Sequence, residues 1–427
     1  MRYSVAKQDI SQHVLIKSRL IDSLAKRTLL KMLQGIQHGT IVLKDEGQRY
    51  QFGSLSSICG LSATITVSDS RFYGSIALGG SIGAAEAYMA GFWQCDNLTN
   101  LIRIILCNQN VLSGMEGGLS TIMNFVHNAL HRQRRNSLER NASNISAHYD
   151  IGNEFFQLFL DDTMTYSCGI FRRGDETMHD ASLQKYDHIC RKIALQPNDH
   201  IVEIGSGWGG FSIYAASSYG CQVTTTTISK SQYELALNRI QQAGLHDRIT
   251  VLLQDYREIK GKFDKLVSIE MIEAVGHEYL ETFFSCCSNL LRNDGIMALQ
   301  AITMNDQMYD YHVKTVDFIR RYIFPGGCVP SVTGLCNAAT AGSDLGLIHF
   351  EDLTPHYPKT LRAWHNRFLS HLDNVRSLGY PDQFIRMWEY YFCYCEAGFT
   401  ERYIGNAQLL FAKPGWRGST LFSLNRE

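Results

Sequence analysis

The apolar positions between residues 200 and 304 fall in short runs that alternate with amphipathic segments. Segments 231–244 and 278–292 repeat apolar residues with a helical period, whereas the runs around them have the length of buried strands. Strands that alternate with helices are typical of a parallel sheet with helices on both faces. The predicted strands are 200–204, 221–227, 249–253, 264–269 and 295–302, and the run AQLLFAKP near the end predicts one more.

A different pattern occupies the first 125 residues, which we expect to form an α+β domain. The runs GTIVLKD, QRYQFG and SATITVSDSRFYGSIALGG predict strands, and GAAEAYMAGFW and NLTNLIRIILCN predict helices. Residues 131–146 lack an apolar period, so we expect a linker over 126–146 and a second domain over 147–427. The linker carries arginines that either contact phosphate head groups or are simply solvated: Arg132, Arg134, Arg135 and Arg140.

Residues 14–33 have the period of a basic amphipathic helix. Two interpretations remain open, because such a helix either lies on an anionic membrane or packs its apolar face on its own domain. The predicted apolar stripe comprises Ile16, Leu20, Leu24 and Leu33, and the basic residues are Lys17, Arg19, Lys26, Arg27 and Lys31.

Composition narrows the class of protein. The 427 residues are too many for one ordinary core, and 40 Lys+Arg against 41 Asp+Glu give no sign of a nucleic-acid partner. The 12 cysteines show no metal-binding spacing, and there is no signal-peptide core or run of about 18 apolar residues. We therefore expect a cytoplasmic protein with reduced cysteines and no metal centre.

The segment HIVEIGSGWGGFSIYAA predicts a strand, a glycine loop and a helix, with Gly205, Gly207 and Gly210 in the spacing G-x-G-x-x-G. Such a loop lets a ligand approach the backbone closely. Glu203 at the end of the strand would repel a pyrophosphate, and the next strand, CQVTTTTIS, lacks the acidic residue that grips an NAD ribose. S-adenosylmethionine (SAM) is a better match, because it has no phosphate and carries an amino group and a sulfonium.

Six segments, one of which includes the glycine loop, occur together and in order: AHYDIGNEFFQLFLDDTMTYSCGIF, VEIGSGWGGFSIYAA, TTISKSQ, LLQDYREI, SIEMIEAVG and RYIFPGGCVPS. From about residue 145 to the end, the chain resembles the cyclopropane-fatty-acyl-phospholipid synthases and the related mycolic-acid cyclopropane synthases. The resemblance implies a Rossmann-like class I methyltransferase domain with a mostly parallel seven-stranded sheet, preceded by a smaller lipid-associated domain. The implied activity is SAM-dependent methylation of a cis double bond in a phospholipid acyl chain, followed by loss of a proton and closure of a cyclopropane ring.

The same resemblance implies bicarbonate as the base that removes this proton. Cys168 and Glu273 would hold the bicarbonate, with Ile302 contributing through its backbone and Tyr357 through its hydroxyl. Cys168 is then a hydrogen-bonding wall of the pocket and not a nucleophile. The chain has Gln300 where the best-known synthases have a histidine. Because glutamine cannot become charged, a methyl-branched or methylene product stays open.

For SAM, the resemblance implies contacts from the glycine loop and from residues after the neighbouring strands. Tyr322 and Phe324 would line the lipid pocket, where a ring face stabilises a cation by up to about 2 kcal/mol. The implied SAM-binding residues are Tyr149, Tyr166, Ser167, Gly205, Gly207, Thr227, Ile228, Gln232, Tyr256 and Arg257, to which the charge argument adds Glu203.

These expectations imply peripheral association with anionic phospholipids at the inner face of the membrane and, from the family alone, a homodimer. Two alternatives remain. One keeps the fold and methylates a soluble amine on nitrogen, and the other is a lipid-binding or scaffolding protein with a decayed site.

Overall fold

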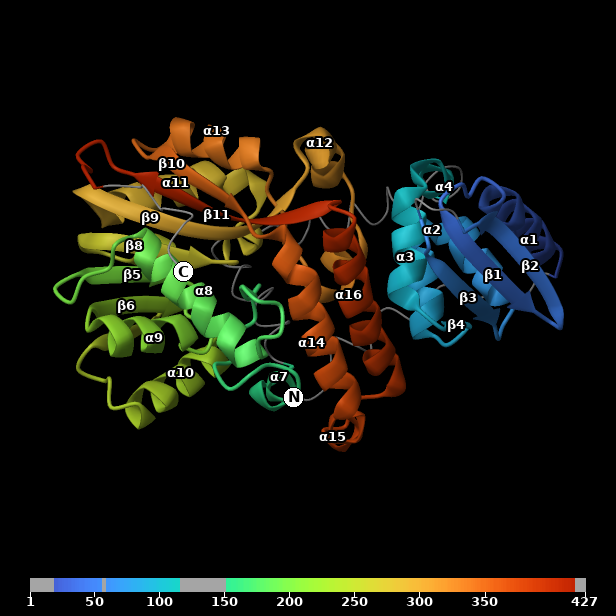
Figure 1. The fold of residues 1–427 in the computed structure, drawn as a ribbon, viewed down its shortest axis with the longest axis horizontal. Helices are drawn as coiled ribbons and strands as arrows, with labels where there is room; N and C mark the ends of the chain where they lie inside the picture. Colours follow the sequence, from blue (N-terminus) through green and yellow to red (C-terminus); the bar gives the residue numbers. More distant parts are fainter. Residues whose placement is uncertain (1–18, 56–58, 116–150, 419–427) are drawn as a thin grey trace. The chain divides into compact units, whose positions relative to one another are not determined.

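The computed structural model describes residues 19–55, 59–115 and 151–418 (Figure 1). The chain divides into an N-terminal unit, described up to Met115, and a C-terminal unit, described from Ile151; the division assigns Arg386–Tyr390 to the N-terminal unit. The predicted linker with its four arginines, residues 14–18 of the predicted basic helix, and Tyr149 lie outside the described residues.

The C-terminal unit is built on a seven-stranded sheet in the order β10-β11-β9-β8-β5-β6-β7. The pairs β5–β6, β5–β8, β6–β7 and β8–β9 are parallel, and β11 runs antiparallel to β9 and β10. The strands are β5 (His200–Ile204), β6 (Gln222–Thr227), β7 (Ile249–Leu253), β8 (Phe263–Ile269), β9 (Leu291–Met304), β10 (Gly346–Asp352) and β11 (Ile404–Ala412). The predicted mostly parallel sheet is confirmed. The chain adds β6 and β7 on one side of β5 and then crosses over to add β8 and β9 on the other side.

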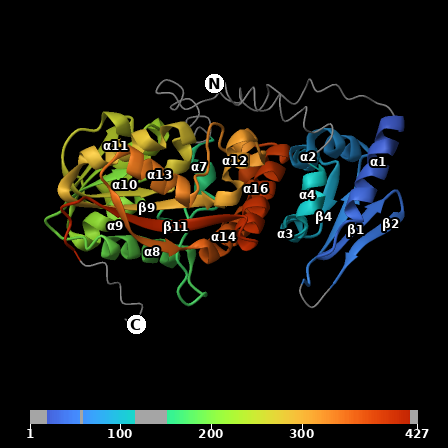
Figure 2. The same cartoon turned by 90° about the horizontal axis from the view of Figure 1, so that it is seen from above.

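Helices lie on both faces of this sheet (Figure 2), and buried apolar side chains form a core cluster on each side. Helices α8 (Met178–Lys192) and α9 (Gly210–Tyr219) cover one face, with Ile240 of α10 (Lys230–Gln242) in the same core cluster. Helices α11 (Leu280–Leu290) and α13 (Val332–Gly342) cover the other face. The remaining helical segments are α7 (Asn153–Gln157), η1 (Tyr256–Glu258), η2 (Ile272–Ala274), η3 (His277–Tyr279), α12 (Asp306–Lys314), η4 (Ile319–Ile323), η5 (Thr354–His356), α14 (Tyr357–Ser370), α15 (Leu372–Ser377) and α16 (Asp382–Thr400).

The N-terminal unit has a four-stranded sheet in the order β2-β1-β3-β4, so the predicted α+β class holds for its described part. Buried Ile41, Leu43 and Ile65 of the sheet and Phe72 of a helix contribute to its core. Its elements are α1 (Arg19–Leu33), β1 (Gly39–Asp45), β2 (Gln48–Ser54), β3 (Ser62–Val67), α2 (Arg71–Met89), β4 (Trp93–Cys95), α3 (Leu98–Cys107) and α4 (Gln109–Met115).

One predicted strand is wrong, because residues 71–80 begin helix α2. Phe72, Tyr73 and Ile76 are buried at helical spacing. The aromatic and glycine-rich sequence resembles the apolar–polar alternation of a strand, which explains the wrong prediction. Gly80 has a φ of 56°, and the chain bends there. A Cβ on Gly83 would lie 1.9 Å from the carbonyl oxygen of Ser75, so only glycine allows this close approach.

The predicted apolar stripe of the first helix is also wrong in one residue. Leu24 is 68% exposed, whereas Ala25, Leu29 and Leu33 form the buried face. Lys26 donates to the buried Asp45 at 2.5 Å, so this lysine is part of the fold. The exposed face of α1 instead presents Leu24, Arg27 and Lys31. None of the helices in the described ranges is long and apolar enough to cross a membrane.

Candidate active site

The glycine loop joins β5 to α9 at the carboxyl edge of the sheet, where ligands bind in doubly wound folds. Gly207 has a φ of +48°, and a Cβ added there would meet no protein atom within 4 Å. This open space beside bare backbone fits the SAM that the sequence predicted. Gly210 has another role, because a Cβ there would lie 2.7 Å from the carbonyl oxygen of Thr163.

The residues predicted after β6 and β7 lie at the same edge but are held by neighbours. The Thr227 hydroxyl donates to the Gln232 side chain at 2.9 Å. Arg257 forms two bonds to Asp255, at 2.8 and 2.7 Å, and Tyr256 is buried against Phe283. Their contacts with SAM, like that of Ile228, stay predictions.

Two other predicted SAM residues precede Cys168. Tyr166 donates its hydroxyl hydrogen to the Tyr391 hydroxyl at 2.9 Å, and Ser167 accepts a bond from Lys185 Nζ at 2.5 Å. Lys185 is fully buried, and burial lowers its pKa to about 8. A cation therefore lies directly behind this segment.

Glu203 is 2% exposed and does not face outward. Its carboxylate accepts bonds from the hydroxyl of Ser212 on α9 and from that of Thr225 on β6, the latter at 2.7 Å. Burial raises its pKa to about 7. These bonds tie β5 to its neighbours, and a contact with a cationic ligand stays a prediction.

The carboxylate of Glu270, directly after β8, is the centre of the site. Its Oε1 accepts bonds from Cys168 N at 3.1 Å, from Gln300 Nε2 at 2.8 Å and from Asn406 Nδ2 at 2.7 Å. Its Oε2 accepts the Tyr357 hydroxyl at 2.5 Å. Three residues predicted as the bicarbonate pocket, Cys168, Gln300 and Tyr357, thus converge on one side-chain carboxylate.

A buried hydrogen-bond chain orients the Gln300 amide. Lys192 Nζ donates to Gln408 Oε1 at 2.7 Å, and Gln408 Nε2 donates to Gln300 Oε1 at 2.9 Å. Because Lys192 can only donate, Gln408 must present its oxygen to Lys192 and its NH₂ group to Gln300. Gln300 then presents its NH₂ group to Glu270. The other partner of Lys192 is Glu351, which also contacts His188.

Glu273 lies next to this centre, three residues beyond Glu270. Its Oε1 accepts the backbone N–H of Ile302 at 2.5 Å, so two groups that were predicted to contact bicarbonate contact each other. Its Oε2 is enclosed and has no hydrogen-bond partner among the residues described. Burial, and then repulsion by Glu270, raise the pKa of Glu273 to about 8. At neutral pH this carboxyl group is therefore mainly protonated, beside a second carboxylate that contacts only donors.

Cys168 is fully buried and its Sγ lies 3.3 Å from the carbonyl oxygen of Gly169. Burial and the charge of Glu270 hold the pKa of this thiol well above its usual range. A nucleophilic thiolate needs the opposite surroundings. These surroundings argue against a nucleophile, and the role of Cys168 as a wall of a bicarbonate pocket stays a prediction.

We expect Cys168→Ser to retain much of the turnover, because the serine hydroxyl can still donate to Gly169 and the bond from the residue 168 backbone to Glu270 is unchanged. Steady-state turnover and SAM affinity of the two proteins would be compared, with Cys190→Ser as the control, because Cys190 is equally buried on α8. Loss of all turnover in folded Cys168→Ser alone would restore the nucleophile.

Aromatic rings enclose the same region. Tyr166 packs against Trp364 at 5.3 Å and Phe324 at 6.3 Å, and Tyr357 stacks on Phe399 at 4.1 Å. Of the two predicted lipid-pocket residues, Phe324 thus lies against a predicted SAM residue. Tyr322 packs on Phe318 and Arg321.

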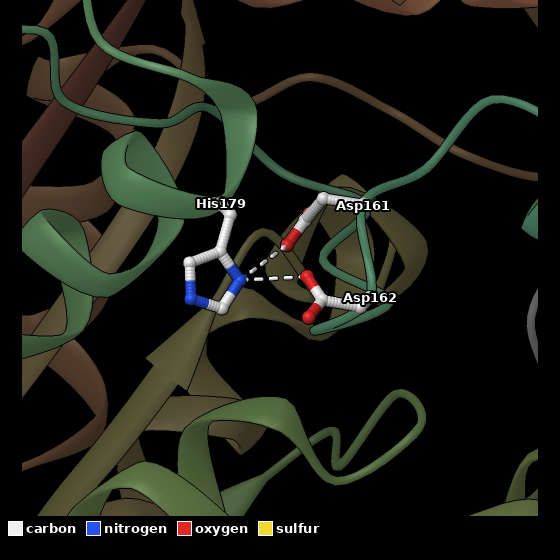
Figure 3. Close-up of side chains that lie close together, drawn as sticks. All are labelled: Asp161, Asp162 and His179. Carbon is white, nitrogen blue, oxygen red and sulfur yellow. Dashed lines mark hydrogen bonds and ion pairs between the residues drawn. The ribbon is translucent and has the colours of Figure 1, made fainter.

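A separate cluster of possible metal ligands comprises Asp161, Asp162 and His179 (Figure 3). His179 Nδ1 lies 2.6 Å from Asp162 and 3.9 Å from Asp161. Asp161 Oδ2 accepts bonds from the backbone and the hydroxyl of Thr163. These contacts explain the cluster as a brace between the loop and α8.

Sequence reasoning missed Glu270, Asn406 and Gln408. Glu270 is inside the quoted segment SIEMIEAVG, at the end of a predicted strand, where polar residues of parallel sheets gather. Asn406 and Gln408 are polar residues two apart in an otherwise apolar strand, opposite Ile302 and Gln300 of β9. That alternation was the signal that could have found them.

Comparison with known proteins identifies the family of this chain. The sequence profile of the mycolic acid cyclopropane synthetase family matches residues 136–409. The chain belongs to this family. Its members are SAM-dependent methyltransferases that act on lipids, and the predicted class I methyltransferase fold is confirmed.

Three relatives show the range of the family. Tuberculostearic acid methyltransferase UfaA1 of Mycobacterium tuberculosis is 35% identical over 354 residues, covering 79% of this chain and 80% of its own. Cyclopropane-fatty-acyl-phospholipid synthase of Escherichia coli K12 is 33% identical over 353 residues, covering 82% and 88%. The crystal structure of mycolic acid cyclopropane synthase CmaA1 complexed with SAH and CTAB superposes with a TM-score of 0.60 and 31% identity, covering 64% of this chain and 98% of that one.

Proposed function

We propose that the protein transfers the methyl group of SAM to the cis double bond of an unsaturated phospholipid acyl chain. SAM supplies an electrophilic methyl group, and the chain's own residues bind the alkene, exclude water and accept a proton. The observation that carries the proposal is the Glu270–Glu273 carboxyl pair next to a wall of aromatic rings.

This arrangement suits a reaction that passes through a carbocation. An alkene is a weak nucleophile, so the reacting atoms must be held about 3–3.5 Å apart. Ring faces such as those of Tyr166 and Phe324 can stabilise a cation on the lipid chain. A nearby oxygen base can then convert this cation to the neutral product by removing a proton. Both elements are present around Glu270.

The proposal includes ring closure to a cyclopropane, and the bicarbonate implied by the resemblance stays a prediction. A methyl-branching activity is the second candidate, favoured by the similarity to a tuberculostearic acid methyltransferase and by Gln300. The soluble amine N-methyltransferase is not favoured, because the family's named relatives act on fatty acids and mycolic acids.

Mass spectrometry of phospholipid acyl chains tests the proposal. The purified protein with SAM and unsaturated phospholipid vesicles should add one CH₂, and locating it separates a ring from a methylene branch. A saturated methyl branch would carry two further hydrogens and so require a reductant. Methylation of soluble amines with unmodified vesicles would contradict the proposal.

We also propose peripheral binding to anionic phospholipid surfaces. The exposed face of α1 supports this, because Leu24, Arg27 and Lys31 lie at positions i, i+3 and i+7 of one helix. The homodimer and the location at the inner membrane face stay predictions.

Vesicle sedimentation is expected to fall as salt rises, because charges at the surface are screened over about 8 Å at physiological ionic strength. The double variant Arg27→Glu and Lys31→Glu should bind anionic vesicles more weakly. The control is Lys230→Glu in the C-terminal unit, which changes an exposed charge on another helix. Equal binding of all three proteins to neutral and anionic vesicles would contradict this contact.

A further inference from the structure

We propose that Glu270 is the catalytic base of this enzyme and takes the place of the bicarbonate that the resemblance implies. This inference rests on the proposed function and names the group that accepts the proton. Its evidence is the set of contacts around one carboxylate, its backbone conformation and the engagement of the predicted bicarbonate donors by carboxyl groups of the protein.

The contacts of Glu270 are those expected of a bound anion. Four donors from four different segments contact it: Cys168 N, Gln300 Nε2, Asn406 Nδ2 and Tyr357 Oη. An ionised carboxylate is an acceptor only, so this set matches it fully. Lys192, through Gln408, fixes the amide of Gln300 in the donating orientation.

The backbone of Glu270 supports a special role for this residue. Its φ is +48°, a left-handed conformation that side chains other than Gly, Asn and Asp rarely adopt. Its N–H nevertheless donates to the carbonyl oxygen of Gln300 at 2.8 Å, so the conformation is held by the sheet. Residues kept in such conformations cluster at functional sites.

The described residues do not fit a bicarbonate in addition to Glu270. Gln300 and Tyr357 already donate to Glu270, and the Ile302 N–H donates to Glu273. The enclosed side-chain atoms without a partner among the described residues include two oxygens, Glu273 Oε2 and Asn406 Oδ1. They also include one donor, the indole N–H of Trp364, whose ring lies near Tyr166 and Tyr357. A second anion would therefore compete with Glu270 and Glu273 for the predicted donors, and it would lie beside the charge of Glu270.

The proton transfer balances without another reactant. The π electrons of the alkene form the new bond to the methyl carbon, and the S–CH₃ electron pair stays on sulfur. The neighbouring chain carbon becomes cationic. Glu270 then takes a proton from the added methyl group, and the electron pair of that C–H bond closes the ring. The protonated Glu270 returns its proton to water after the product leaves.

The first experiment measures turnover of unsaturated vesicles in buffer stripped of bicarbonate and after bicarbonate is added. Wild-type turnover should be the same in both buffers. Glu270→Gln should lower turnover by about 10²–10⁴-fold, the usual contribution of a general base, while SAM affinity measured by calorimetry is unchanged. The matched control is Glu281→Gln, which removes the same charge at an exposed position on α11.

The second experiment uses Glu270→Gly, because glycine suits the φ of +48° and its substitution frees the four donors. Carbon-13 NMR should detect binding of labelled bicarbonate to Glu270→Gly and none to the wild type. Added bicarbonate should restore turnover in this variant. If Glu270→Gly does not fold, the comparison of wild-type and Glu270→Gln turnover still tests whether Glu270 is the base.

A wild-type protein that binds bicarbonate at this site or requires it for turnover would overturn the proposal, as would wild-type turnover in Glu270→Gln. Failure of the proposed function would give a different result, because neither the wild type nor any variant would then add CH₂ to a lipid. The NMR comparison still tests the occupancy of the site in that case.

Discussion

Gly207→Val is expected to weaken SAM binding by about a hundredfold or more, equivalent to about 2.7 kcal/mol of binding free energy. A Cβ at this position meets no protein atom within 4 Å, so a branched side chain would occupy the open space beside the loop. The φ of +48° adds strain of about 1–3 kcal/mol for any residue with a branched Cβ. The strain acts on folding and the occupied space acts on SAM binding, so we expect the variant to lose both stability and affinity.

Isothermal calorimetry with SAM would measure this loss, and circular dichroism would establish that the variant is folded. Gly244→Val is the matched control, because Gly244 has a φ of +68° and equally open surroundings but follows α10, away from the carboxyl edge of the sheet. The control should lose stability and keep its SAM affinity. Wild-type affinity in folded Gly207→Val would show that the loop is not the binding site.

The parallel strands of the C-terminal unit could be predicted closely because they are buried on both faces. Such strands read as continuous apolar runs with glycine or helix signals at their ends, and the buried strand β5 matches its predicted range of 200–204. The antiparallel edge strand β10 was missed. Its residues are exposed or half-buried and mixed in polarity, and its pairing with β11 includes an irregularity between Leu347 and His349. Tertiary pairing, rather than its own sequence, makes it a strand.

The candidate site was predicted in part, and the missing part has a physical reason. The motif resemblance located Cys168, Glu273, Gln300, Ile302 and Tyr357, which the structure gathers around two carboxyl groups. It did not reveal Glu270, because a resemblance transfers only the positions already known to act. The hydrogen bonds to Glu270 come from residues up to 136 positions away in sequence, which no local pattern encodes.

Glu273 is expected to make the protein less stable as pH rises. Its pKa is raised from 4.5 to about 8 by burial and by Glu270. Between these values the folded protein keeps a proton that the unfolded chain has lost, so the free energy of unfolding falls with increasing pH. The stabilisation is complete below about pH 4.5 and is lost as pH passes through about 8. At about 1.4 kcal/mol per pKa unit, the loss amounts to about 3–5 kcal/mol.

Glu273→Gln should remove this dependence, since glutamine is neutral at every pH and can still accept the Ile302 N–H. Urea unfolding of both proteins from acidic to alkaline pH measures the effect, and the variant should gain stability relative to the wild type as pH rises. Glu258→Gln is the control, because Glu258 is exposed at the surface of η1 and its loss should give a constant difference. A constant difference for Glu273→Gln as well would contradict the raised pKa.

The same variant separates the two carboxyl groups in catalysis. Glutamine at position 273 imitates the neutral carboxyl that the raised pKa implies, so Glu273→Gln should keep more turnover at neutral pH than Glu270→Gln. A carboxyl group that keeps its proton at neutral pH, as Glu273 does, can stay neutral beside a second carboxyl group that accepts a proton. Burial raises the pKa of Glu273, whereas the carboxylate of Glu270, three residues earlier in the same segment, is surrounded by four donors.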